Sequence, residues 1–158
     1  MGLRVRTRCG GAGVAVRIEC LRQQHEAAED IAATIMSGIA SYGDEYDAIP
    51  LARLIGKLNA LLRVHFAYED TVLYPLMIRS GDGQAAALAH LFAAETGSLA
   101  PRFEDFVRRW SGPTAIDSMF DQFREEATML FGALAARIER ENDLLYPLAE
   151  QVTQQKAA

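Results

Sequence analysis

Apolar residues recur every three or four positions along most of the chain, which is the spacing of amphipathic helices. The first apolar stripe starts at Val16 and stops near Gly43, where a polar turn follows. A second helix is expected with Pro50 in its first turn, where the missing N–H of proline costs nothing. Pro75 lacks the N–H that would continue this helix, so we expect the helix to end or bend there.

Two further helices complete the pattern. The third is expected from about Gln84 to Trp110, with Pro101 as a kink or interruption. The fourth carries apolar residues from Phe120 onwards, and Pro147 should end it or start a short terminal turn. Four helices joined by short loops favour antiparallel neighbours. The predicted fold is therefore all-α, an up-down-up-down four-helix bundle.

Length and charge limit the number of domains and the classes of partner. The 158 residues suit one domain, with the bundle over residues 16–150, a basic Gly/Arg-rich leader over 1–15 and a flexible tail over 151–158. The net charge of −5 argues against nucleic acid as a partner, and no apolar run approaches the ~20 residues that span a membrane. Cys9 and Cys20 are too few for a disulfide framework, so we interpret them as reduced thiols. These features predict a cytoplasmic protein.

Several polar side chains fall on stripes that should face the core. His25 lies on the first stripe, and His65 continues the second, with Glu69 one turn further along the same face. His90 is surrounded by alanines on the third helix, which would let another side chain or an ion approach. All three histidines of the chain are thus expected to point inward from different helices.

The second and fourth predicted helices also end alike. Glu69 is followed at a fixed spacing by Leu-Tyr-Pro-Leu, and the same run follows Glu141 near the end of the fourth helix. Arg137 and Glu141 continue the apolar stripe of that helix. The core should therefore contain two carboxylates, and a buried carboxylate without a partner is energetically costly.

Imidazoles and carboxylates that converge from four helices offer donors that suit iron, manganese or zinc. We therefore expect a metal site, and the alternative is a purely structural polar layer. The candidate ligands are His25, His65, Glu69, His90 and Glu141. No Ser/His/Asp or Cys/His nucleophile is visible besides these histidines, so an enzymatic activity is not favoured.

Taken together, the motifs resemble the hemerythrin-like (His-His-Glu cation-binding) domain over nearly the whole chain apart from the leader. The resemblance implies a non-haem di-iron centre in which His25 and His65 serve one iron, His90 the other, and Glu69 and Glu141 bridge. The implied cofactor is one or two iron ions, with manganese or zinc as alternatives. Members of that family bind oxygen, sense oxygen, nitric oxide or redox state, hold iron or help repair damaged iron centres.

Arg137 departs from the family pattern, because it stands where the resemblance implies the last histidine ligand. A guanidinium has no lone pair to offer, and its repulsion of a divalent ion ~5 Å away costs several kcal/mol. We predict that Arg137 occupies the second metal position and pairs with Glu69, Glu141 or both. The alternative is that the Arg137 side chain extends outward to the surface and pairs there. On this basis an Arg137→His variant is expected to regain a second ion.

The sequence thus predicts a cytosolic, non-haem metal-binding protein with an incomplete metal site, for which one ion is favoured over none. Its expected role is oxygen, nitric-oxide or redox sensing, or iron handling, and its protein partner is unknown. The alternative function is a metal-free interaction or regulatory module in which Arg137 replaces the charge of the metal.

Overall fold

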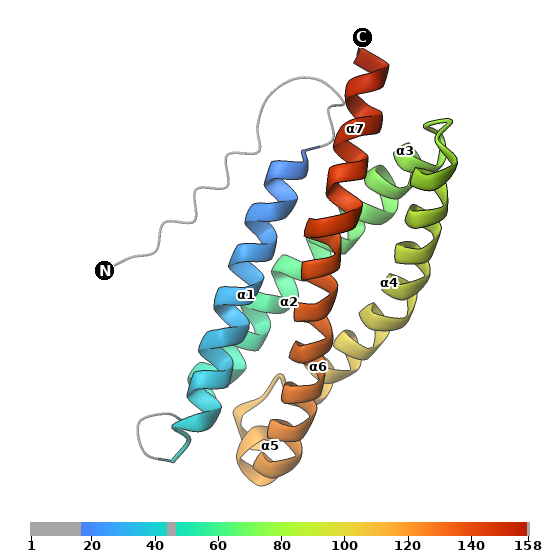
Figure 1. Cartoon of the computed structure of the whole chain (residues 1–158). Coiled ribbons are helices and arrows are strands. Elements are labelled where there is room, and N and C mark those ends of the chain that lie inside the picture. Colours follow the sequence, from blue (N-terminus) through green and yellow to red (C-terminus); the bar gives the residue numbers. More distant parts are fainter. Residues whose placement is uncertain (1–16, 44–46, 158) are drawn as a thin grey trace.

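The predicted four-helix bundle is confirmed by the computed structural model, which describes residues 17–43 and 47–157. These residues form helices and no strand, and the long helices alternate in direction (Figure 1). The leader over 1–15 lies outside the described residues. The elements are α1 (Ile18–Ala40), α2 (Ala48–Tyr68), η1 (Glu69–Leu73), α3 (Tyr74–Ile78), α4 (Gly83–Trp110), α5 (Pro113–Ser118), α6 (Phe120–Arg140), η2 (Glu141–Leu145) and α7 (Tyr146–Ala157), where η marks a π-helical segment.

Side-chain caps set where two of the long helices begin. The Asp47 carboxylate accepts the N–H of Ile49 at 2.8 Å, so α2 starts just before Pro50. The Asp82 carboxylate accepts two backbone N–H groups at the start of α4. Gly81, at φ +90°, makes the turn that leads into this cap, a conformation that costs glycine little.

Prolines interrupt the bundle less than expected. Pro75 and Pro147 end no helix, because a π-helical segment comes before each of them. The N–H groups of Tyr74 and Tyr146 bond carbonyls five residues back, and this wider register accommodates the proline that follows. As a result, α2, η1 and α3 form one continuous rod, and α6, η2 and α7 form another. α4 also runs without interruption through Pro101.

The chain beyond residue 150 differs from the prediction of a flexible tail. α7 continues to Ala157, and Val152 is only 2% exposed. Val152 packs in the same apolar cluster as Ile18 and Leu21 of α1. Burial of this side chain explains why a Gln-rich segment stays helical, since packing of an apolar face outweighs weak local propensity.

Two other expectations concern membranes and cysteines. No helix in the described ranges is both long and apolar enough to cross a membrane. Cys20 lies in α1 and is disulfide-bonded, which corrects the prediction of a reduced thiol. Sequence spacing alone does not show whether a cysteine meets a partner in space. Cys9 lies outside the described residues.

The core is divided into two apolar clusters. All four rods of the bundle, which are α1, α4 and the two continuous rods, contribute to both clusters. The lower core, toward α5 in Figure 1, includes Ile35, Leu62, Phe103 and Leu134. The upper core, toward α3 and α7, includes Leu21, Met77, Phe92 and Tyr146. The buried polar residues lie where the two clusters meet: His25, His65, Glu69, Thr96, Arg137 and Glu141.

Candidate metal centre

The candidate site is this layer of buried polar side chains, to which all four rods contribute. None of its six members is more than 5% exposed. α1 supplies His25, and α4 supplies Thr96. Each rod with a π-helical segment supplies a basic residue and, four positions later, a glutamate. These pairs are His65 and Glu69 on one rod, and Arg137 and Glu141 on the other. Apolar side chains of the upper and lower core border this layer, and its low exposure shows that it is closed to solvent.

The imidazoles of His25 and His65 face each other through one nitrogen each. Their Nε2 atoms are 3.2 Å apart. The opposite nitrogens are engaged elsewhere: Nδ1 of His25 donates to the side-chain oxygen of Asn142 at 2.9 Å, and Nδ1 of His65 to that of Gln24 at 3.0 Å. A neutral imidazole that donates through Nδ1 presents a lone pair at Nε2. Two such lone pairs cannot face each other this closely without a cation between or beside them.

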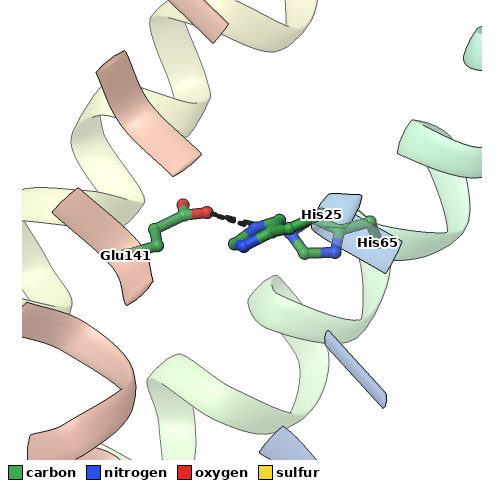
Figure 2. Close-up of side chains that lie close together, drawn as sticks. All are labelled: His25, His65 and Glu141. Atoms are coloured by element: carbon green, nitrogen blue, oxygen red, sulfur yellow. Dashed lines mark hydrogen bonds and ion pairs between the residues drawn. The ribbon is translucent and has the colours of Figure 1, made fainter. Parts of the chain in front are cut away.

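Glu141 completes a cluster of three donors with these histidines (Figure 2). Its Oε2 atom is 2.9 Å from Nε2 of His25 and 3.8 Å from Nε2 of His65. Neither carboxylate oxygen has a partner in hydrogen-bond geometry, although both are buried. Ligands on one ion at distances of about 2.0–2.2 Å stand roughly 3 Å apart, so the separations in this cluster fit a shared metal ion.

Glu69 borders the cluster and is held by two phenols. Its Oε1 atom lies 3.4 Å from Nε2 of His65. Tyr146 donates to Oε1 at 3.1 Å, and Tyr74 donates to Oε2 at 3.0 Å. The Tyr146 hydroxyl is also 3.1 Å from Nε2 of His25. Both carboxylate oxygens of Glu69 therefore accept hydrogen bonds, whereas neither oxygen of Glu141 does.

Arg137 lies on the other side of the two glutamates. Its Nη2 atom is 2.6 Å from Oε1 of Glu141 and 3.7 Å from Oε2 of Glu69. The side chain is 5% exposed. These contacts confirm the prediction that Arg137 pairs with both carboxylates, and they exclude the alternative course to the surface.

The charges of this layer follow from these contacts. Burial would lower the pKa of His65, but the neighbouring carboxylates of Glu141 and Glu69 outweigh it and raise that pKa to about 9. Burial would raise the pKa of Glu141, but the two histidines and Arg137 lower it to about 2. At neutral pH the metal-free layer therefore contains an ionised Glu141 and a protonated His65.

His90 does not join the cluster. It is exposed on α4, whereas its neighbour Ala89 is fully buried. The inward positions of α4 at the level of the site are Phe92 and Thr96. The prediction that His90 faces the core is therefore wrong, and α4 brings no imidazole to the layer.

Several residues that support the site were not predicted from the sequence. Tyr74 and Tyr146 belong to the repeated Leu-Tyr-Pro run, so the repeat was a signal for them as well as for the glutamates. Gln24 and Asn142 gave no signal beyond lying next in sequence to His25 and Glu141. Thr96 could have been found from its apolar neighbours, since it continues the stripe of Phe92 and Leu99.

Comparison with known proteins agrees with this geometry. The family model described as the hemerythrin HHE cation binding domain matches residues 12–149, most of the chain. No curated protein and no solved structure matches the chain. The matched range includes every member of the polar layer, and the layer contains the histidine and glutamate donors that a cation requires. The chain therefore belongs to the hemerythrin HHE cation-binding family.

Proposed function

We propose that this protein binds a single non-haem metal ion, iron, through His25, His65 and Glu141, with Glu69 as a bordering carboxylate. The observation that carries this proposal is the facing pair of Nε2 atoms, 3.2 Å apart, beside a buried carboxylate without hydrogen-bond partners. A metal ion would replace the proton that His65 otherwise needs. Manganese and zinc suit the same nitrogen and oxygen donors, so they are the alternative ions.

The residues around these donors would hold them ready for the ion. Asn142 and Gln24 accept from the Nδ1 atoms and so fix the tautomer and the ring orientation of both histidines. Tyr146 and Tyr74 hold the carboxylate of Glu69 in place. When bound, iron would supply a redox-active centre that interacts with small molecules such as oxygen or nitric oxide.

The proposed role is oxygen, nitric-oxide or redox sensing, or iron handling, rather than catalysis, and the proposed setting is the cytoplasm. The disulfide bond at Cys20 argues against that setting, because the cytoplasm keeps most thiols reduced. Thiol trapping of protein taken directly from its source cells tests whether Cys20 is reduced, as the cytoplasm would keep it. A reduced Cys20 supports the cytoplasm, and an oxidised one contradicts it.

A second candidate function is a metal-free bundle that acts as an interaction or regulatory module. The 2.6 Å contact between Arg137 and Glu141 favours it, because the guanidinium already neutralises a buried carboxylate. Metal analysis of freshly purified protein, before and after incubation with ferrous iron, distinguishes the two functions. We expect about one iron ion per chain. No bound metal under either condition would refute metal binding and support the metal-free module.

An Arg137→His variant should still bind one ion, not the two expected from the sequence. The second position would gain one imidazole from α6 but none from α4, since His90 is exposed and Phe92 and Thr96 face the site. Adding Phe92→His supplies a ring from α4 at a fully buried position. The double variant is therefore expected to approach two ions per chain by metal analysis. Two ions in the single variant would show that Arg137 alone limits the site.

A further inference from the structure

The Arg137 guanidinium lies in a buried pocket of polar groups beside the two glutamates, on the side away from the histidines. Its Nη2 atom donates to the Thr96 hydroxyl at 2.6 Å and to the Tyr74 hydroxyl at 2.7 Å. Its Nη1 atom donates to the backbone carbonyl of Phe92 at 3.3 Å. The Phe92 ring also lies 5.4 Å from the guanidinium carbon. α3 and α4 thus hold this side chain in one place with directional contacts.

The Glu141 carboxylate lies between the guanidinium and the histidine of α1. One oxygen of Glu141 faces Arg137 at 2.6 Å, and the other faces His25 at 2.9 Å. Glu69 is arranged in the same way, with one oxygen 3.7 Å from Arg137 and the other 3.4 Å from His65. Both carboxylates therefore share their negative charge between a fixed organic cation and the donor cluster.

We propose that Arg137, positioned by Thr96 and Tyr74, makes this site prefer a divalent over a trivalent ion and so keeps bound iron ferrous. This inference rests on the proposed metal binding and adds the preference for one charge state. A ferric ion carries one positive charge more than a ferrous ion, so a fixed cation on the far side of the shared carboxylates repels it more strongly. Apolar side chains enclose the layer, and solvent therefore screens this repulsion little.

The reduction potential of the iron-loaded protein tests the proposal, because one electron passes between the electrode and iron without any bond being made or broken. Arg137→Gln removes the charge and is expected to lower the midpoint potential by at least 59 mV, which corresponds to a tenfold gain in relative ferric affinity. Arg137→Lys keeps the charge and should stay close to the parent. Thr96→Val leaves the charge but removes one of its anchors, so its potential should fall between those of the parent and Arg137→Gln.

Arg140→Gln is the matched control, since it removes the same charge one turn along the same rod. Arg140 pairs with Glu95 through two contacts of 2.9 Å, and its side chain is 41% exposed. Solvent screens it, so we expect less than a third of the shift seen in Arg137→Gln.

Equal shifts in Arg137→Gln and Arg140→Gln would overturn the proposal while leaving metal binding intact. If Arg137→Gln does not fold, Thr96→Val decides: an unchanged potential in this variant overturns the proposal. A parent protein that binds no iron would refute the proposed function and this inference together.

Discussion

In the metal-free protein, Arg137→Met is expected to lower the free energy of unfolding by about 3–5 kcal/mol. The variant leaves Glu141 and Glu69 without the guanidinium that lies 2.6 Å and 3.7 Å from them. It also leaves the hydroxyls of Thr96 and Tyr74 without their donor. Urea unfolding in the presence of a chelator measures the loss, with a midpoint that falls while the slope stays constant.

Arg140→Met is the control for this prediction. The ion pair of Arg140 with Glu95 lies on the surface, and such pairs contribute at most about 1 kcal/mol. Adding Glu141→Gln to Arg137→Met should recover part of the stability, because it removes one of the uncompensated charges. Equal losses in Arg137→Met and Arg140→Met would mean that Arg137 does not compensate the buried carboxylates.

His65→Ala is expected to abolish metal binding, from about one ion per chain to none detectable. The change removes one of the two facing nitrogens and leaves Glu69 and Glu141 without an imidazole that lies 3.4 Å and 3.8 Å from them. Changes to residues that only support a ligand already cost 10–100-fold in affinity, so losing a ligand should cost more. The metal-free bundle should stay folded and lose about 1–3 kcal/mol of stability.

Metal analysis and circular dichroism of the same preparation check both parts of that prediction. His90→Ala serves as the matched control, because it removes an imidazole from an exposed position outside the cluster. We expect it to keep the metal content of the parent and to change stability by no more than about 0.5 kcal/mol. Unchanged metal content in His65→Ala would refute the ligand assignment. Loss of metal in His90→Ala would mean that α4 does contribute a ligand.

The helical bundle and most of the polar layer could be predicted from the amino-acid pattern alone. Apolar spacing fixed which faces of the first, second and fourth helices are buried, because large side chains such as Leu21, Leu62 and Leu134 mark one clear stripe. Polar residues that interrupt such a stripe must share its burial. His65, Arg137 and the two glutamates could therefore be placed in the core, and charge complementarity predicted that Arg137 pairs with the carboxylates.

The third helix was different, because its first half is rich in alanine and offers no unique apolar face. Successive residues on a helix differ in direction by about 100°. A buried stripe assigned one residue away from the true one therefore predicts that His90 points inward. The structure instead buries Ala89, Phe92 and Thr96. Packing against the other three rods decided this rotation, since it places the bulky Phe92 in the upper core.

The ends of the helices and the surroundings of the donors also depend on packing between the rods. Local rules for proline predicted breaks at Pro75 and Pro147, whereas π-helical segments carry both rods past these residues. Those rods bring Tyr74, Tyr146 and Asn142 to the layer from positions far from their partners in sequence. Hydrogen bonds between helices depend on the rotation and axial register of each rod, which apolar periodicity leaves open and packing of the assembled bundle fixes.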